Sequence, residues 1–336
     1  MTPPAPPIDP RVWTYLAWRG TPGARVTPLT GDASTRRYLR VDRDGDPSFI
    51  IALYPEPFDP QALPFLNVAR LFARLRLPIP AVRDVAGHLG IVALEDLGDV
   101  TLQAHLAGLA PADALRWYEQ AVDLIVQLQQ RAAAEASPAF LPYGLAFDEE
   151  KLTWELDFFT RHFLEAHRGI VLDAATRDAL AQEWHAMAAE LAAEPRVVCH
   201  RDYHSRNLMV QGHRLVLIDF QDARMGPDTY DLVSLLRDSY VRLPGADVDR
   251  LVARFLAAPG RPAVDPAAFR ARFTLMALQR NLKALGTFGY QMAVAGRPQY
   301  AESIPPTLAY VREHLAAAPR FARLQGLLAP HLPELR

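Results

Sequence analysis

The pattern of apolar residues changes near residues 97–100, and this change limits the folds open to the chain. After it, apolar residues recur at helical spacing, interrupted only by short strands and a polar loop at 197–222. Before it lies one predicted helix, over 61–76, and apolar runs that predict strands over 27–29, 38–41, 49–54, 82–85 and 89–94. We therefore expect an α+β fold, with a small antiparallel β-rich lobe carrying one helix (residues 1–97) and a larger, mostly helical lobe (residues 98–336).

Composition excludes several classes of protein. Half of the 336 residues are apolar, and 36 Lys and Arg against 38 Asp and Glu leave a net charge of −2. This balance gives no basic field for nucleic acid or an anionic membrane, so neither partner is expected. The single cysteine, Cys199, excludes an internal disulfide framework and a multi-cysteine metal site. No signal-peptide pattern and no apolar run of about 18 residues is visible, so we expect a soluble cytoplasmic protein.

Only two lysines occur, Lys151 and Lys283. A Walker A loop requires Gly-Lys followed by Ser or Thr, but Leu152 and Ala284 follow these lysines. The sequence therefore excludes P-loop chemistry.

The segment at 198–222 carries the strongest chemical signal. Asp202 and Asn207 lie five residues apart on a polar loop, and Asp219 ends the strand that follows a predicted Gln211-Gly212 turn. A hairpin would bring that carboxylate back beside the loop. One or two carboxylates with an amide oxygen suit Mg²⁺, which shares its remaining positions with water and phosphate. Because phosphoryl transfer depends mainly on positioning and charge neutralisation, these residues would nearly complete a site for it.

The motifs in and around this segment resemble a known family. His200-Arg201-Asp202 with Asn207, followed by Asp219-Phe220, is similar to the catalytic and metal-binding loops of protein-kinase-like enzymes. The later Gly226-Pro227 and Tyr230-Asp231 resemble the aminoglycoside phosphotransferase and choline kinase branch. With 31–38, 94–99 and 218–238, the chain most resembles the anomeric N-acetylmuramate/N-acetylglucosamine kinases of cell-wall recycling, over about residues 28–315.

The resemblance implies a protein-kinase-like fold with the active site in the cleft, using ATP and Mg²⁺ to phosphorylate the C1 hydroxyl of these sugars. It makes Asp202 the catalytic base and Asn207 and Asp219 the metal ligands. Asp231 is expected to bond back to the catalytic loop and His200 to have a packing role. For Asp222, contact with metal and contact with solvent both stay open.

The small lobe departs from the usual kinase pattern. No lysine lies in the third strand, at 50–54, and the following helix offers no glutamate to pair with one. The resemblance assigns nucleotide binding to the remaining candidates, which are Gly31, Ser34 and Thr35 in the first turn, Arg37 (with Arg36 as the alternative source of the missing charge), and Glu95 and Leu97 at the hinge beside adenine.

The acceptor pocket is expected in the helical lobe, facing Asp202. Trp154 or Phe288 could supply an aromatic platform for a sugar. The charged candidates are Asp238 and Lys283 and, chosen as substrate contacts, Glu155, Asp157, Arg237 and Arg280.

Three other functions stay open at this level. An aminoglycoside, choline or other alcohol kinase would use the same chemistry, and an acidic acceptor pocket would favour polycationic aminoglycosides. The absent lysine allows a non-catalytic nucleotide-binding protein. A metal-dependent hydrolase would use the same carboxylates and release phosphate without an acceptor.

Overall fold

The computed structural model describes residues 7–29, 36–43 and 45–336, and the chain divides into two compact units. The first unit comprises Met1–Val100 and Met209–Gln221, and the second comprises Thr101–Leu208 and Asp222–Arg336. On sequence grounds the chain was divided at residue 97, whereas the first stretch of the first unit runs to Val100. That division did not predict that the chain returns to the first unit at 209–221.

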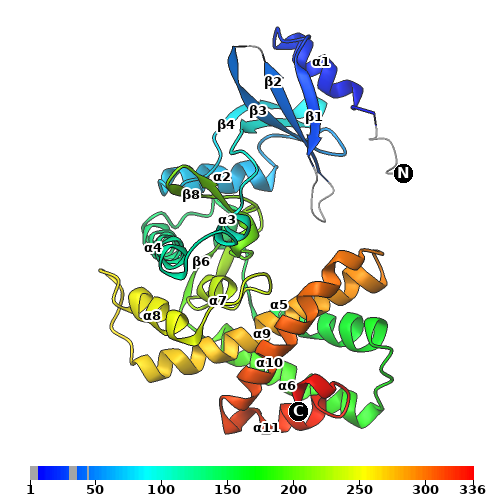
Figure 1. Cartoon of the computed structure of the whole chain (residues 1–336), viewed down its shortest axis with the longest axis vertical. Coiled ribbons are helices and arrows are strands. Elements are labelled where there is room, and N and C mark those ends of the chain that lie inside the picture. The colour runs from blue at the N-terminus through cyan, green and yellow to red at the C-terminus, as the bar shows by residue number, and fades with distance from the viewer. Residues whose placement is uncertain (1–6, 30–35, 44) are drawn as a thin grey trace. The chain divides into compact units, whose positions relative to one another are not determined.

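A five-stranded antiparallel sheet forms the first unit (Figure 1). Its order is β1 (Arg25–Leu29), β2 (Arg37–Arg43), β3 (Asp46–Leu53), β5 (Ile91–Glu95) and β4 (Val82–Ala86). Helix α2 (Pro64–Arg74) follows β3 and a short 3₁₀ turn, Gly87–Leu89, joins β4 to β5. The predicted α+β class with five strands and a helix in this order is confirmed.

Helix α1 (Pro10–Trp18) precedes the sheet and was not expected from the sequence. Asp9 caps it by accepting a hydrogen bond from the Arg11 N–H, and Pro10 occupies the first helical position. Val12, Tyr15 and Leu16 share one buried face at helical spacing. The signal was present, in a capping aspartate followed by proline.

The two faces of the sheet have different roles, because side chains alternate along each strand. One face forms the core of the unit against α1, through Leu39 and Val41 of β2 and Ile51 and Leu53 of β3. Residues one position away, such as Tyr38, Arg40 and Ala52, lie on the opposite face. There Arg40 pairs with Asp96 at 2.7 Å and Asp99 at 2.8 Å, which ties β2 to the segment after β5.

Backbone hydrogen bonds and a stacked pair of aromatic rings attach segment 209–221 to the rest of the first unit. It holds the end of β7 (Leu208–Gln211) and β8 (Arg214–Leu217), joined by a turn at Gly212 with a φ of 61°. The Val210 N–H donates to the Val100 carbonyl and the Leu217 N–H to the Pro78 carbonyl, each at 2.8 Å. Phe220 then stacks on Phe65 of α2, with ring centroids 5.1 Å apart.

Helices build the second unit. They are α3 (Leu102–Leu106), α4 (Pro111–Ala134), α5 (Glu149–Phe159), which continues as a π-helical turn (Thr160–His167), α6 (Ala174–Ala192), α7 (Tyr230–Leu236), α8 (Gly245–Leu256), α9 (Pro266–Ala293), α10 (Ile304–Ala316) and α11 (Ala322–Leu328). A two-stranded sheet of β6 (Arg196–Cys199) and β9 (Arg224–Pro227) interrupts them. An interruption was predicted at 197–222, but β9 lies beyond that segment and its pairing with β6 was not predicted.

The long helix α9 crosses the second unit at close range to α5 and its π-helical extension. Two glycines permit this approach. A Cβ at Gly289 would lie 2.4 Å from the His162 carbonyl oxygen, and one at Gly286 would lie 2.8 Å from the Phe159 backbone. This close packing fixes the position of the α9 residues that lie at the candidate site.

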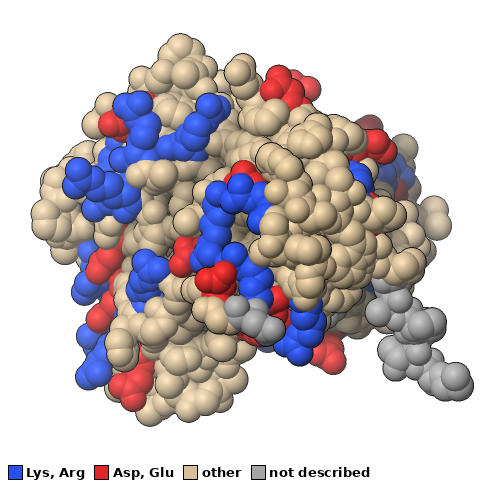
Figure 2. All heavy atoms as spheres, turned by 90° about the horizontal axis from the view of Figure 1, so that it is seen from above, with Lys and Arg blue, Asp and Glu red and all other residues tan. Residues whose placement is uncertain are grey.

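Charged side chains on the surface are mixed in sign. Acidic and basic groups lie beside one another on the face shown in Figure 2, in keeping with the near-zero net charge. Among the helices that the structure describes, none is long and apolar enough to cross a membrane.

Candidate active site

The loop that follows β6 is held by a buried carboxylate. Asp231, at the start of α7, accepts hydrogen bonds from the backbone N–H of His200 at 2.7 Å and of Arg201 at 3.1 Å. Burial raises the pKa of Asp231 to about 7, although the two amide donors act in the opposite direction. The expectation that Asp231 would bond back to this loop is confirmed.

Arg201 adopts an unusual backbone conformation at this point, with a φ of 84°. A non-glycine residue in this region is strained, and such strain concentrates at functional sites where surrounding contacts enforce it. The contacts to Asp231 supply that enforcement. The turn at Arg201 gives the next residue, Asp202, its direction.

Asp202 lies among cations of the second unit. Its Oδ1 is 3.5 Å from the Lys283 Nζ, and its Oδ2 is 3.8 Å from the Arg201 Nε. Burial tends to raise the pKa of Asp202, but the charges of Lys283, Arg201 and Arg280 outweigh it and hold the pKa well below its usual range. The group is therefore an ionised carboxylate, 24% exposed, that can accept a hydrogen bond from a hydroxyl.

Asn207 is fixed by the same loop. Its Nδ2 donates to the Asp202 carbonyl at 2.9 Å and lies 3.5 Å from the His204 Nε2. With the NH₂ group used in this way, the planar amide of Asn207 is fixed in orientation, with its oxygen on the opposite edge from Nδ2. An oriented amide oxygen is a ligand that Mg²⁺ accepts, so the residue fits the metal role predicted for it.

Asp219 belongs to the first unit, two residues after the end of β8. It too has a left-handed backbone, with a φ of 61°, and its side chain is 43% exposed. Its Oδ1 accepts a hydrogen bond from the Gln221 Nε2 at 2.9 Å and lies 3.4 Å from the Arg36 Nη2. A hard, partly exposed carboxylate in an enforced conformation fits a magnesium ligand.

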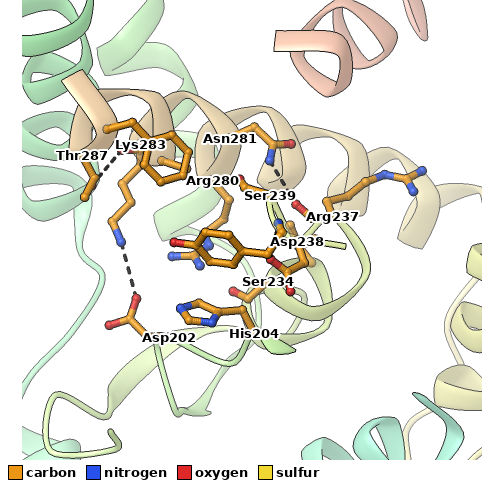
Figure 3. Close-up of a pocket in the computed structure, with 14 residues that line it drawn as sticks. Asp202, His204, Ser234, Arg237, Asp238, Ser239, Arg280, Asn281, Lys283 and Thr287 are labelled. Atoms are coloured by element: carbon orange, nitrogen blue, oxygen red, sulfur yellow. Dashed lines mark hydrogen bonds and ion pairs between the residues drawn. The ribbon is translucent and has the colours of Figure 1, made fainter. Parts of the chain in front are cut away.

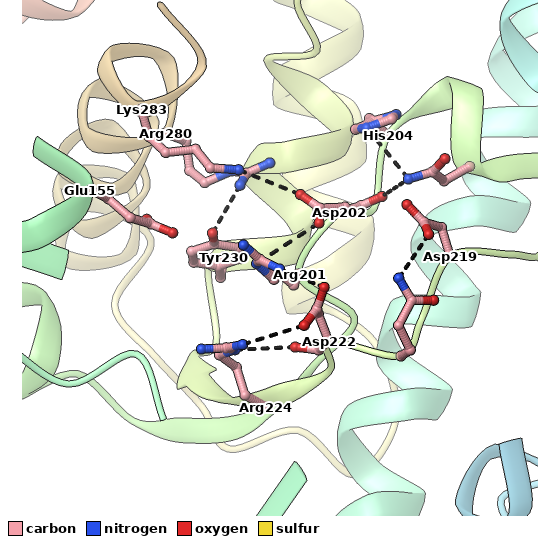
Figure 4. A network of polar contacts seen from close by, with 12 residues as sticks. Glu155, Arg201, Asp202, His204, Asp219, Asp222, Arg224, Tyr230, Arg280 and Lys283 are labelled. Carbon is pink, nitrogen blue, oxygen red and sulfur yellow. Dashed lines mark hydrogen bonds and ion pairs between the residues drawn. The ribbon is translucent and has the colours of Figure 1, made fainter. Parts of the chain in front are cut away.

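Asp222 is engaged by arginines in the second unit (Figure 4). Its Oδ2 lies 2.8 Å from the Arg201 Nη1, and its backbone carbonyl accepts from the Arg224 Nε at 3.1 Å. These contacts give Asp222 a part in holding the Arg201 side chain.

A cavity of about 130 Å³ opens beside Asp202 within the second unit (Figure 3). Four lining residues come from one face of α9, at spacings of three and four: Arg280, Lys283, Ala284 and Thr287. The other lining residues are Asp202, His204, Val233, Ser234, Arg237, Asp238, Ser239, Tyr240, Asn281 and Phe288.

The structure brings only some of the predicted acceptor contacts to this cavity. Arg237 and Arg280 line it, as do Asp238, Lys283 and Phe288. The guanidinium of Arg237 points away from Asp202 in Figure 3 and packs 5.5 Å from the Tyr310 ring centroid.

Glu155 and Asp157 lie outside the lining. Glu155 shares the buried face of α5 with Leu152 and Phe159 and accepts a hydrogen bond from the Gln279 Nε2 at 3.0 Å. Asp157 lies on the exposed side of that helix, and Trp154 is 50% exposed with Lys151 over its ring.

Several lining residues were not anticipated, chiefly His204, Tyr240, Asn281 and Thr287. For Thr287 a signal existed, since it continues the helical spacing of Arg280 and Lys283. Tyr240 follows α7 in a loop, and Asn281 reaches the cavity beside Arg237, whose backbone carbonyl accepts from its Nδ2 at 3.1 Å. Those placements depend on tertiary packing.

The predicted nucleotide contacts are described only in part. Gly31, Ser34 and Thr35 lie outside the described residues. The Arg37 Nη2 donates to the Pro7 carbonyl at 3.3 Å, and the Glu95 carboxylate accepts from the Ala81 N–H at 3.1 Å. Leu97 is half-buried in the segment after β5.

The chain belongs to the Phosphotransferase enzyme family, whose sequence pattern it matches over residues 25–270. It is 31% identical over 326 residues to the N-acetylmuramate/N-acetylglucosamine kinase of Pseudomonas aeruginosa, which covers 95% of this chain and 92% of the relative. It is 32% identical to the N-acetylmuramate/N-acetylglucosamine kinase of Neisseria meningitidis, over 90% of this chain and 89% of that one. The predicted resemblance is confirmed.

Solved structures share the fold at lower identity. A choline/ethanolamine kinase family protein from Mesorhizobium loti superposes with a TM-score of 0.62 at 18% identity, covering 97% of this chain and 98% of its own. The aminoglycoside phosphotransferase APH(2″)-IIa, in complex with gentamicin, gives a TM-score of 0.63 at 13% identity, over 90% of this chain and 97% of that one.

Proposed function

We propose that the protein is an ATP- and Mg²⁺-dependent kinase of the cytoplasm that phosphorylates the C1 hydroxyl of N-acetylmuramate and N-acetylglucosamine in cell-wall recycling. The observation that carries the proposal is the ionised Asp202 carboxylate at the edge of a cavity in the second unit. The names of the relatives, which match over nearly the whole chain, support the choice of acceptor.

In this proposal Asp202 accepts a hydrogen bond from the C1 hydroxyl and orients its oxygen toward the γ-phosphorus of ATP. The new O–P bond forms as the bond from the γ-phosphorus to the bridging oxygen breaks, so that ADP leaves and the hydroxyl proton passes to the Asp202 carboxylate. Asn207 and Asp219 would hold Mg²⁺, which neutralises phosphate charge when bound. Both lie close to points where the chain passes from one unit to the other, after Leu208 and after Gln221.

Lys283 supplies positive charge where the attacking hydroxyl would meet the phosphate. Its Nζ is 3.5 Å from Asp202, and a hydroxyl bound to that carboxylate would lie within reach of it. A fixed cation at this place stabilises the negative charge of the transferring phosphoryl group. Burial lowers the pKa of Lys283, while Asp202 acts to raise it and so favours the charged form.

The charges around the cavity argue against a polycationic acceptor. The cations of Arg280 and Lys283 line it against the carboxylates of Asp202 and Asp238, while the Arg237 guanidinium is directed away from Asp202. Asp238 is already used as an acceptor, by the Ser205 N–H at 2.9 Å and the Tyr240 N–H at 2.9 Å. A lining of this kind offers an aminoglycoside or choline no excess of negative charge and suits a neutral or acidic sugar.

The experiment is an acceptor panel with purified protein and Mg-ATP. N-acetylmuramate, N-acetylglucosamine, choline and kanamycin are added separately, ADP formation is followed, and the phosphorylated position is read by ³¹P NMR. We expect ADP only with the two sugars and an anomeric phosphate as the product. Equal ADP formation without any acceptor would indicate a hydrolase, and its absence with all four would contradict the proposal.

A further inference from the structure

Arg36 occupies a partly buried position in the first unit, beside the candidate metal ligand. Its side chain is only 12% exposed, and its Nη2 lies 3.4 Å from the Asp219 Oδ1. Its Nη1 lies 3.5 Å from the Gln221 Oε1. The rings of Tyr38 and Tyr54 flank the guanidinium, each with its centroid 5.8 Å away. A cation held in this way is directed toward one site and is not a solvated surface group.

The strand register places Arg36 beside the end of the strand that lacks the expected lysine. Arg37 pairs with Leu53 across β2 and β3, so Arg36 lies opposite Tyr54, at the end of the strand predicted to carry that lysine. Side chains at 36 and 38 point to the sheet face away from α1, because the residues on the α1 side are Leu39, Val41 and their neighbours. Arg36 also directly follows the turn at 31–35 that the sequence predicts to hold phosphates.

Asp219 explains why such a cation is stable without a nucleotide. A guanidinium removed from water costs free energy unless an anion pairs with it, and the Asp219 carboxylate supplies that anion. A bound Mg²⁺ would draw the same carboxylate, and the ATP phosphates would offer the guanidinium a bidentate partner in exchange.

We propose that Arg36 replaces the missing strand-three lysine as the cation that binds the ATP phosphates. In the absence of nucleotide Arg36 pairs with Asp219, and on binding of Mg-ATP the guanidinium would pair with the phosphates and the Asp219 carboxylate with Mg²⁺. The inference rests on the proposed function, since it needs ATP as the ligand. Arg37 is the alternative, but its side chain is directed to the Pro7 carbonyl.

The experiment measures binding and not turnover. Dissociation constants of ATP, with Mg²⁺, and of adenosine are determined by calorimetry for the full chain and for Arg36→Met, Arg36→Lys, Arg37→Met and Arg25→Met. Arg25 is a matched surface control, since its side chain is 80% exposed and pairs with Asp42. We expect Arg36→Met to bind ATP about 10- to 100-fold more weakly than the wild type, because the charge-assisted hydrogen bonds from Arg36 to the phosphates are lost. Adenosine binding should stay unchanged, Arg36→Lys should recover part of the loss, and Arg25→Met should match the wild type.

Three results would overturn the inference. They are wild-type ATP affinity in Arg36→Met, equal losses for ATP and adenosine, which indicate a structural role, and a loss in Arg37→Met alone. Failure of the wild-type chain to bind ATP at all would instead contradict the proposed function, so the two failures are distinguishable.

Discussion

Lys283 of α9 and Asp202 of the loop after β6 form an ion pair, with Nζ and Oδ1 3.5 Å apart. Lys283 is one of only two lysines in a chain whose other 34 long cationic side chains are arginines. The pair brings a helix from late in the sequence to the residue proposed as catalytic base. It also sets the charge at the edge of the cavity, where the acceptor hydroxyl would bind.

Replacing Lys283 should therefore slow phosphoryl transfer. We expect Lys283→Met to lower kcat about 100-fold with both sugars, because one fixed cation at the reacting phosphate is lost. Lys283→Arg should recover part of the activity. The control is Lys151→Met, which removes the other lysine, a cation stacked 3.8 Å above the Trp154 ring. A loss confined to N-acetylmuramate would instead assign Lys283 to the acceptor's carboxylate.

Asp231 should prove essential for the shape of the catalytic loop. In Asp231→Asn one acceptor oxygen remains, but an NH₂ group then faces one of the two backbone N–H groups that the carboxylate now satisfies. The buried amide left unpaired should cost about 1–3 kcal/mol in the free energy of unfolding, and kcat should fall with the displaced loop. Thermal denaturation and the ADP assay measure both. Asp249→Asn, on the exposed side of α8, is the control and should change neither.

Gly289 should resist substitution more than an exposed glycine. Alanine normally stabilises a helix relative to glycine, but its Cβ here would meet the His162 carbonyl oxygen at 2.4 Å. Since that atom is backbone, α9 must shift, and we expect Gly289→Ala to lower the free energy of unfolding by about 1–3 kcal/mol. Gly108→Ala, whose Cβ would meet no atom within 4 Å, should be neutral. Equal stability of the two variants in urea would contradict the packing described for α9.

His314 gives the stability a defined dependence on pH. It lies on α10, 5% exposed, and burial, followed by the nearby Arg237, lowers its pKa to about 3. The unfolded chain binds a proton near pH 6.5 and the folded chain does not, so stability is full above pH 6.5 and falls toward pH 3. Within that interval His314 lowers the free energy of unfolding by about 1.4 kcal/mol for each pH unit of acidification.

Urea denaturation of the wild type and of His314→Leu at pH 7.5, 6.5, 5.5 and 4.5 tests this dependence. The variant should lose stability less steeply on acidification, because the carboxylates act equally in both proteins. His185→Leu, which replaces an exposed histidine, should follow the wild type. Parallel curves for His314→Leu and the wild type would show that His314 does not carry the effect.

The order of strands and helix along the first unit was predictable from the sequence because strand-like segments alternate there with turn residues, but the spatial order of the strands in the sheet was not predicted. The proximity of Asp202 and Asn207 was predictable because one short loop carries both, and their roles in catalysis and metal binding stay predictions. Glu155 was predicted as an acceptor contact, although its spacing to Leu152 and Phe159 places it in the apolar stripe of α5. That spacing argues for burial, which is what the structure has.

Other features depend on contacts that no local pattern encodes. Segment 209–221 joins the first unit through backbone hydrogen bonds to Val100 and Pro78 and through the Phe65–Phe220 stack. The pairing of Lys283 with Asp202 depends on the depth at which Gly286 and Gly289 let α9 pack. The choice between Arg36 and Arg37 depends on which side chain the strand alternation turns toward Asp219.

The most direct measurement compares turnover and nucleotide binding in Asp202→Asn. The amide keeps the size of the side chain but removes the charge that orients the acceptor hydroxyl and takes up its proton. We predict that kcat with N-acetylglucosamine falls at least about 100-fold while the dissociation constant of Mg-ATP changes less than about twofold. Turnover near the wild-type rate in this variant would contradict the assignment of Asp202 as catalytic base.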